Sequence, residues 1–416
     1  MKVLTTFLVL ALLGSAAAQG PTRLTLDQAI QLALVHSPAL KATRSQLPQS
    51  QAQEVTAHLR PNPTLAWDTQ FLPLFHPSQF TSEILNDQAQ WDMGVGYLFE
   101  RGSKRQRRYQ AAQAATAVTQ SQVADAERML ALTVAQDFVA VLQAESNLAL
   151  AQDNLNSFQQ TVTISEQRFQ AGDISEADYL KIKLQLLQFQ TDVSTAMLDR
   201  AQALIALRQQ IGYEAVPADY DVAGDLTYQP VSSSLDDLKA AALRDRPDLA
   251  AAQRAIKAAQ AQYQLARANS KQDLSTTFNF SHVAGTSTGA FFFNIPLPVF
   301  DRNQGEIART RFVIDQSQAQ AIAANETVLS DVSNAFEAVR SNEQVVKLYV
   351  SGYLNAAQQS REITQYAYQK GAATLLDLLD AERSYRATQL AYRDALASYM
   401  TAVEQLRAAI GTRSLP

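Results

Sequence analysis

The sequence predicts a mixed α+β protein in which one unit of helices, strands and very long helices occurs twice. Three observations support this fold class: an internal repeat, pairs of segments with alternating apolar residues, and long stretches without glycine or proline. The repeat is clearest where paired glycines enclose two stretches of 39 residues each, Asp173 to Ile211 and Ala372 to Ile410. Because this period is far longer than that of a solenoid, we interpret the repeat as a duplicated half-domain.

The N-terminus has the features of a signal peptide: Lys2, the apolar run Val3 to Leu13, and the small residues Ala16 to Ala18. A buried N-terminal helix is the alternative interpretation of the same run. No later stretch has about 18 consecutive apolar residues, so no transmembrane helix is expected. The predicted domains are a signal peptide and two structural repeats, at residues 1–18, 19–222 and 223–416.

Composition and motif content argue against several functional classes. The net charge of −5 argues against a nucleic-acid partner. Since the chain has no cysteine, it has no disulfide and no thiol that could carry a lipid anchor. The histidines share no metal-ligand spacing and no phosphate loop or catalytic triad is present, so we expect no metal site, no cofactor and no enzymatic activity. The histidines are His36, His58, His76 and His282.

Each repeat is expected to begin with helices. In the first repeat, Thr25 is the expected N-cap of a helix that Pro38 interrupts and that resumes to about Arg60. In the second repeat, the corresponding helix begins at Ser234 and breaks at Pro247. The two prolines therefore mark equivalent positions in the two repeats.

Two segments with alternating apolar and polar residues follow each of these helices. Each has one aromatic-rich face and a length of about ten residues, which is the pattern of a strand in a membrane barrel. The alternative is an ordinary half-buried sheet packed on helices. Four strands cannot close a barrel, so a membrane-embedded sheet must pair its edges with other chains, which predicts an oligomer. The positions on the apolar faces are Leu65, Trp67, Thr69 and Phe71; Trp91, Met93, Val95, Tyr97 and Phe99; Leu274, Thr276, Phe278 and Phe280; and Phe291, Phe293, Ile295 and Leu297.

Very long helices follow the strands. Residues 103–171 contain neither glycine nor proline, and a helix of that length would reach roughly 100 Å. The matching run at residues 306–370 is interrupted only by Gly352, and each long helix is expected to turn at a glycine, Gly172 or Gly371. The first return helix has two apolar stripes, which predicts apolar neighbours on both sides, as in a wall of helices. The stripes are Leu180, Leu184 and Leu187, and Ile182, Leu186, Phe189 and Val193.

Short motifs lie at the ends of the predicted strands and at the glycine turns. Pro61-Asn62-Pro63 precedes the first strand, and Phe99 to Arg105 follows the second. Pro296 to Gly305 follows the fourth strand, and Asp377 to Ala381 follows the glycine of the second turn. In this order the motifs resemble the TolC-type outer-membrane efflux proteins over essentially the whole mature chain. The segment after the fourth strand is similar to the branch that serves heavy-metal tripartite pumps.

The resemblance implies the assembly and its location. It implies a homotrimer in the outer membrane, with four strands per chain in one twelve-stranded barrel and a helical tunnel that crosses the periplasm. It also implies a periplasmic adaptor protein and an inner-membrane pump as partners, with the adaptor docking on the hairpin tips at Gly172, Ser175, Gly371 and Thr374. The implied function is a passive exit duct. A periplasmic coiled-coil adaptor or scaffold, and a type I protein-secretion channel, are the alternatives.

The resemblance also places a gate at the second hairpin tip. Asp377 and Asp380 match two aspartates that point into the tunnel mouth, and three copies would form a ring of carboxylates that attracts cations. The alternative is that both are solvated aspartates near a helix start. Tyr368 and Asp178 match positions that latch the closed state. Ala373 stands where other members have an arginine, so the chain departs from the family's latch at this position.

The segment Leu72 to Gln90 makes the first strand pair longer than the second. Its prolines, its histidine and its Asn86-Asp87 pair are typical of a surface loop. We expect this loop to be extracellular and to cover part of the outer mouth.

Overall fold

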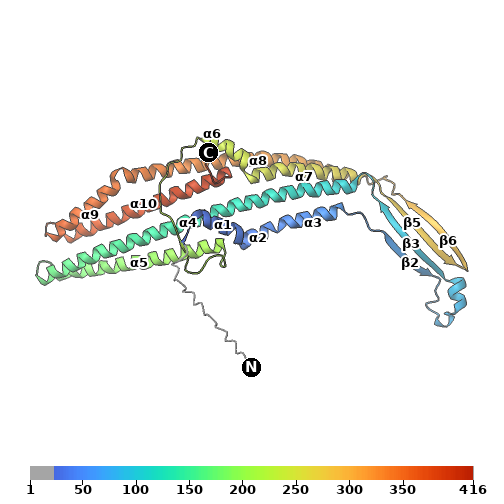
Figure 1. Cartoon of the computed structure of the whole chain (residues 1–416), viewed down its shortest axis with the longest axis horizontal. Helices are drawn as coiled ribbons and strands as arrows, with labels where there is room; N and C mark the ends of the chain where they lie inside the picture. Colours follow the sequence, from blue (N-terminus) through green and yellow to red (C-terminus); the bar gives the residue numbers. More distant parts are fainter. Residues whose placement is uncertain (1–22, 416) are drawn as a thin grey trace, which may run out of the picture. The chain divides into compact units, whose positions relative to one another are not determined.

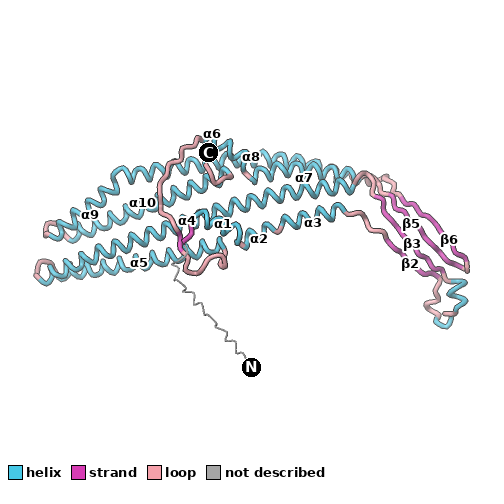
Figure 2. The backbone as a smooth tube through the Cα atoms, viewed as in Figure 1, coloured by secondary structure: helices cyan, strands magenta, loops and turns pink. Residues whose placement is uncertain are grey.

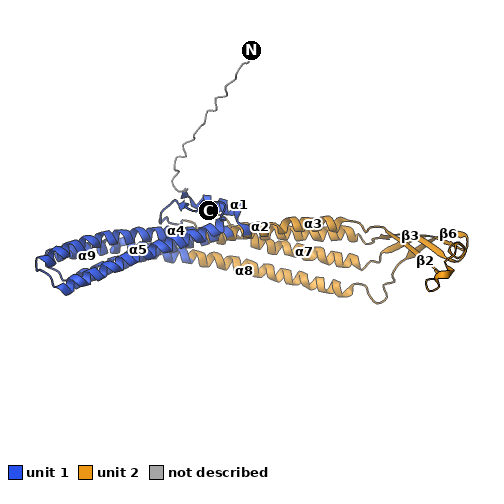
Figure 3. Ribbon diagram, turned by 90° about the horizontal axis from the view of Figure 1, so that it is seen from below, with its two compact units in different colours: residues 1–38, 130–231, 337–405 blue, residues 39–129, 232–336, 406–416 orange. Residues whose placement is uncertain are grey.

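The computed structural model describes residues 23–415, and the predicted signal peptide lies outside the described residues (Figures 1 and 2). Its contacts divide the chain into two compact units, each of which draws on both halves of the sequence (Figure 3). Unit 1 contains the described residues up to Pro38, Leu130–Val231 and Glu337–Gln405. Unit 2 contains Ala39–Met129, Ser232–Phe336 and the residues from Leu406 onward. The units are therefore distinct from the two predicted repeats, which follow the chain order.

The order of elements is helices, two strands, a long helix and a return helix, and it occurs in each half of the chain. The first half contains β1 (Arg23–Leu24), α1 (Leu26–His36), α2 (Pro38–Arg44), α3 (Gln46–His58), β2 (Thr64–Gln70), the short helical turns η1 (Pro77–Gln79) and η2 (Ile84–Gln88), β3 (Gln90–Phe99), α4 (Lys104–Gln170) and α5 (Glu176–Ile211). The second half contains β4 (Asp221–Val222), α6 (Leu235–Asp245), α7 (Pro247–Asn269), β5 (Leu274–Val283), β6 (Thr286–Asn294), α8 (Gln304–Leu348), the turn η3 (Tyr349–Tyr353), α9 (Leu354–Gln369) and α10 (Leu375–Ile410).

The first helices begin where the sequence predicts. Thr25 caps α1 through a reciprocal pair of hydrogen bonds with Gln28, a capping box. Pro38 and Pro247 each start a new helix after a break, as expected from the missing N–H and fixed φ of proline. The helix expected to continue to about Arg60 breaks once more at Ser45, whose hydroxyl bonds back to the Lys41 carbonyl at 2.9 Å.

The structure confirms the long helices that were predicted from the two stretches without glycine or proline. Helix α4 is 67 residues long and α8 is 45 residues long. The predicted interruption lies in η3, where Gly352 has a φ of 147° between α8 and α9. Only glycine adopts that conformation readily, so the break is specific to this position.

The four predicted strands form one antiparallel sheet in unit 2, in the order β2-β3-β5-β6 (Figure 2). One row across it joins Leu65, Val95, Phe278 and Phe291 in register. These four side chains are 72%, 51%, 42% and 70% exposed, so the helices of this chain do not bury the apolar face. The alternative of a half-buried sheet packed on helices is wrong for this chain.

The strand ends differ from the prediction at two places. Strand β2 has only seven residues and ends before Phe71, whose φ is 59°. Strand β6 ends at Asn294, so Ile295 and Leu297 lie outside it. Pro296 lacks the N–H that a continuing ladder needs, which explains this end.

No helix within residues 23–415 combines the length and the apolarity needed to cross a membrane.

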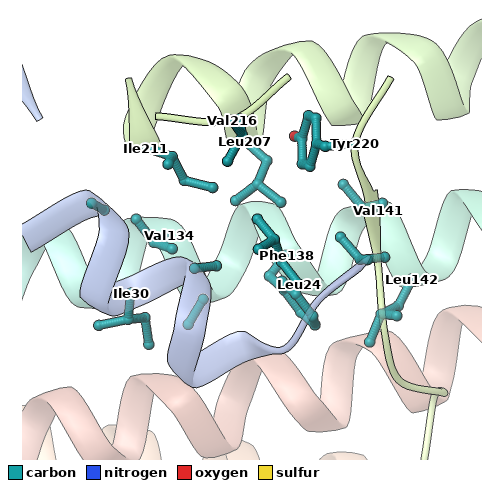
Figure 4. Close-up of a cluster of buried hydrophobic side chains, with 14 residues drawn as sticks. Leu24, Ile30, Val134, Phe138, Val141, Leu142, Leu207, Ile211, Val216 and Tyr220 are labelled. Carbon is teal, nitrogen blue, oxygen red and sulfur yellow. The ribbon is translucent and has the colours of Figure 1, made fainter. Parts of the chain in front are cut away.

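Unit 1 has its own apolar core, in which residues from α1, α4 and α5 pack against the loop that follows α5 (Figure 4). Phe138 and Leu207 are 3% and 0% exposed at its centre. Next to them, β1 pairs in parallel with β4, with Leu24 opposite Val222. This short pairing brings the segment before α1 next to the segment that joins the two halves of the chain.

Candidate functional site: the helix hairpin tips

Both predicted hairpin turns lie in unit 1 and have the same backbone pattern. Gly172 and Gly371 have φ values of 81° and 75°, in the left-handed region that favours glycine. At the first turn the N–H of Gly172 donates to the Phe169 carbonyl, and the N–H of Asp173 donates to the Arg168 carbonyl. The second turn has the same two bonds, from Gly371 to the Tyr368 carbonyl and from Ala372 to the Ala367 carbonyl. This is a Schellman motif, in which glycine ends a helix and satisfies its last carbonyls.

The return helices are capped by the two predicted docking residues. The Ser175 hydroxyl accepts from the Asp178 N–H at 3.1 Å, and the Thr374 hydroxyl accepts from the Asp377 N–H at 3.2 Å. In each case the aspartate accepts in return from the capping hydroxyl, at 2.9 Å and 2.6 Å. Ser175 and Thr374 therefore fix the directions of α5 and α10 at the tips.

The two predicted gate aspartates have different surroundings. Hydrogen bonds from the hydroxyl and the backbone N–H of Thr374 lower the pKa of Asp377 below its ordinary value of 3.8. Asp380 forms an ion pair of 2.5 Å with Arg383, and both side chains are mostly exposed. Asp377 therefore has the local role of a helix-capping carboxylate, while Asp380 remains on the surface of the single chain.

The two predicted latch residues bond to different partners in this chain. Asp178 bonds to Ser175 and Lys181, and these hydrogen bonds lower its pKa. Tyr368 is only 3% exposed, and its hydroxyl lies 3.3 Å from the Ser165 hydroxyl. The structure therefore places Tyr368 against α4 and Asp178 within the first turn of α5.

Arg168 is a contact of Tyr368 that sequence reasoning missed. Its Nη1 donates to the Tyr368 carbonyl at 2.7 Å, and its guanidinium lies 5.1 Å from the centre of the Tyr368 ring. Arg168 belongs to α4 and Tyr368 to α9, so this contact joins the two hairpins within one chain. A signal was available in the repeat: Arg168 stands four residues before Gly172, whereas Ala367 stands four residues before Gly371.

Apolar side chains hold the four helices together beneath the tips. Phe158 and Phe189 stack at 4.5 Å between ring centres, and Ile182, Tyr368 and Leu378 complete the buried cluster. Ala373, at the position where an arginine was expected, packs against the same cluster. The position thus contributes apolar contact in place of a charge.

The two stripes of α5 have different outcomes. In the stripe that faces the cluster, Ile182, Phe189 and Val193 are buried, which confirms apolar neighbours on that side. In the other stripe, Leu180, Leu184 and Leu187 are 51%, 69% and 59% exposed. An apolar neighbour on that side stays a prediction.

A groove between α5 and α10 contains a buried acid. Glu382 is 4% exposed, and burial raises the pKa of its carboxyl above the ordinary value of 4.5. Arg386, nearby, pairs with Asp192 at 2.6 Å and lies over the Phe189 ring. The groove holds about 550 Å³ and also includes Asp380.

No group of three or more histidine, cysteine, aspartate or glutamate side chains in residues 23–415 is arranged to hold a metal ion. The tips thus offer capping hydroxyls, surface carboxylates and a contact between the hairpins.

A chain that combines long helical hairpins with a sheet whose apolar face is exposed has the architecture of an outer-membrane channel subunit. The chain belongs to the outer membrane efflux protein family, whose sequence profile matches residues 29–213 and again residues 238–412. Membership assigns it to efflux across the outer membrane, with a part in the periplasm, and not to enzymatic catalysis.

Known relatives are similar over most of the chain. The cobalt-zinc-cadmium resistance protein CzcC of Cupriavidus metallidurans is 26% identical over 383 residues, which cover 90% of this chain and 86% of CzcC. The cation efflux system protein CusC of Escherichia coli K12 is 27% identical over 63% of this chain and 59% of its own length. A crystal structure of a membrane protein from Pseudomonas aeruginosa covers 93% of this chain and 92% of its own, with a TM-score of 0.78 and 20% identity.

Proposed function

We propose that the chain is one third of a homotrimeric exit duct in a tripartite efflux system. Each chain contributes four strands to a twelve-stranded barrel, and its helical hairpins form the wall of a periplasmic tunnel. A periplasmic adaptor docks on the hairpin tips and connects the duct to an inner-membrane pump. The two halves of each chain are two copies of one structural repeat, with a boundary near residues 222–223.

The observation that carries the proposal is the sheet with two open edges. Within the described chain, β2 pairs only with β3 and β6 pairs only with β5. Open edges cannot remain unpaired in the hydrocarbon region, because each free N–H and C=O costs several kcal/mol there. Pairing β2 of one chain with β6 of the next closes the edges.

The exposed apolar side chains support the same assembly. The row that contains Leu65 and Phe291 lies on one face of the sheet and suits contact with lipid. On α5, the exposed stripe with Leu184 at its centre suits contact with a neighbouring chain in a wall of helices. Contiguous exposed apolar surfaces of this kind mark contact with lipid or with another protein chain.

The gate is proposed at the second hairpin. Asp377 and Asp380 from three chains would surround the tunnel mouth, and the hairpin contact made by Tyr368 would hold the mouth closed. Docking of the adaptor around Gly172, Ser175, Gly371 and Thr374 would act on the same turns. Relatives include a cobalt-zinc-cadmium resistance protein and pyoverdine export proteins. Because such different cargoes are named for similar ducts, we infer that the pump and not the duct selects the cargo.

Paired cysteines test the trimer, since the natural chain has no cysteine. We expect Leu65→Cys combined with Phe291→Cys or Phe293→Cys to give covalent oligomers in outer-membrane fractions. These positions lie in the two edge strands, so a link between them joins different chains. The control pair Val95→Cys and Phe278→Cys is opposite in register within one chain and should link only the monomer.

Unlinked protein should also migrate as a heat-sensitive trimer in unheated gels. A monomer in the soluble periplasmic fraction, with no oligomer from either edge pair, would contradict the duct and favour a periplasmic scaffold. A type I protein-secretion channel would form the same trimer. It is separated from an efflux duct by testing whether deletion abolishes secretion of a polypeptide or raises sensitivity to metal cations.

A further inference from the structure

Two carboxylates lie directly opposite each other on the polar face of the sheet. Asp68 in β2 pairs in register with Asp92 in β3, and Asp92 pairs in turn with Ser281 in β5. Like charges in directly opposite positions of an antiparallel pair destabilise it. The ion pairs of residues 23–415 include neither aspartate. Their mutual repulsion is therefore not offset by a basic side chain.

The hydrogen bonds around Asp68 and Asp92 reach only some of their carboxylate oxygens. Gln70 Nε2 donates to Asp68 Oδ2 at 3.1 Å and to Asp92 Oδ2 at 3.4 Å, and Gln90 Nε2 donates to the same Asp92 oxygen at 2.7 Å. Asp92 is 7% exposed, yet its Oδ1 is buried without a hydrogen-bond partner. A buried polar atom left in this state costs about 1–3 kcal/mol, and more when it is charged. The Ser281 and Asn279 side chains also lie beside the Asp92 carboxylate. An anionic oxygen without a hydrogen-bond partner, next to a second carboxylate, favours a positively charged ligand.

The surrounding side chains offer the oxygen atoms that a hard cation prefers. Gln90 Nε2 also lies 3.4 Å from the Ser281 hydroxyl, which brings β5 into the cluster. Rotation of the Gln70 and Gln90 amides would present their carbonyl oxygens in place of their N–H groups. Calcium takes about six to eight oxygen ligands from carboxylates, amide carbonyls and water, so the protein oxygens here would be completed by water.

We propose that Asp68 and Asp92, together with Ser281 and the side-chain oxygens of Gln70 and Gln90, bind a divalent cation of the calcium type. The bound cation neutralises the like-charge pair and links β2, β3 and β5 beside the loop at residues 71–89. All five residues belong to one chain and one unit. The site therefore depends neither on the trimer nor on the proposed gate.

The two tryptophans of the chain provide a direct probe. Trp67 immediately precedes Asp68 and Trp91 immediately precedes Asp92, and the chain has no other tryptophan. Terbium(III) substitutes for calcium at oxygen sites and emits when an excited tryptophan lies nearby. Purified full-length mature protein in detergent should give saturable, tryptophan-sensitised terbium emission that calcium displaces.

Variants decide the assignment. Asp68→Asn with Asp92→Asn should weaken terbium binding by at least about tenfold, the lower end of effects at metal sites. Asp87→Asn, a change at an exposed aspartate in the loop at residues 71–89, should leave terbium binding unchanged. Asp377→Asn with Asp380→Asn should leave the tryptophan-sensitised emission unchanged, because that emission reports only a cation near Trp67 or Trp91 and not one at the gate. Equal sensitised emission from the wild type and the first double variant would overturn the proposal.

Thermal unfolding gives a second measurement that does not depend on luminescence. Calcium should raise the melting temperature of the wild type and leave that of the Asp68→Asn/Asp92→Asn variant unchanged. Without calcium, the variant should be at least as stable as the wild type, because the repulsion is removed. A proton shared between the two carboxylates would instead give stabilisation at low pH with no response to calcium, and that result would also overturn the proposal.

Discussion

The contact between Arg168 and Tyr368 gives the sharpest test of how the two hairpins are held together. Replacing Arg168 by alanine removes the 2.7 Å hydrogen bond to the Tyr368 carbonyl and the guanidinium over the Tyr368 ring. The Ser165 hydroxyl remains beside the Tyr368 hydroxyl, so the variant removes the charged part of the contact alone. In the proposed duct, opening moves the second hairpin away from the first and breaks this contact.

The magnitude follows from the geometry. A hydrogen bond from a charged donor contributes about 1.5–3 kcal/mol, and a cation over a ring at a partly exposed site adds about 0.5–1 kcal/mol. We expect Arg168→Ala to destabilise the contact between the hairpins by about 1.5–3 kcal/mol, because one side chain supplies both interactions and their energies are not additive. At about 1.4 kcal/mol per tenfold, the open population rises roughly ten- to hundredfold.

Single-channel conductance in planar bilayers measures the open population, and hydrogen exchange at the tip amides measures local opening. Both should increase for Arg168→Ala. The matched control is Lys370→Ala, which removes a cation lying 5.5 Å from the exposed Tyr366 ring at the same turn. If Arg168→Ala opens no more often than Lys370→Ala, the contact does not hold the hairpins and the reasoning is refuted.

Three further predictions concern the gate, a buried acid and a close backbone contact. Alanine at both Asp377 and Asp380 should reduce block of the channel by multivalent cations, and unchanged block would contradict the carboxylate ring. Glu382→Gln should raise the melting temperature near neutral pH, because burial raises the pKa of Glu382 above 4.5 and the ionised form is disfavoured in the fold. That gain should disappear as the pH falls below 4.5, where both states hold the proton, and a pH-independent gain would argue against burial of the charge. Gly411→Ala should destabilise by about 1–2 kcal/mol or more, since φ is 82° and the new Cβ would lie 3.0 Å from a backbone carbonyl oxygen, whereas Gly305→Ala has open space and serves as its control in denaturant titrations.

Local chemistry allowed much of the fold to be predicted from the sequence. The Thr25 cap, the breaks at Pro38 and Pro247, and the interruption at Gly352 each depend on one residue and its immediate neighbours. Strand alternation gave the face on which each apolar residue lies, because side chains alternate strictly along a strand. These features needed no knowledge of distant contacts.

Prediction was weaker where two distant segments meet. The pairing of β1 with β4 involves two residues on each side, too few to leave a pattern. The duplication pointed to the turns at Gly172 and Gly371, but not to the partner of Tyr368. That partner is Arg168, 200 residues earlier, and only the packing of α4 against α9 brings the two together.

The sequence by itself indicated the long helices, the four strands of the sheet and the family resemblance, since these depend on periodicity, caps and short motifs. The tertiary structure decided which polar groups meet: Arg168 with Tyr368, Thr374 with Asp377, and Asp68 with Asp92. The physical reason is that charge and hydrogen bonding act only over short distances. The strand register and helix packing that set those distances are properties of the folded chain.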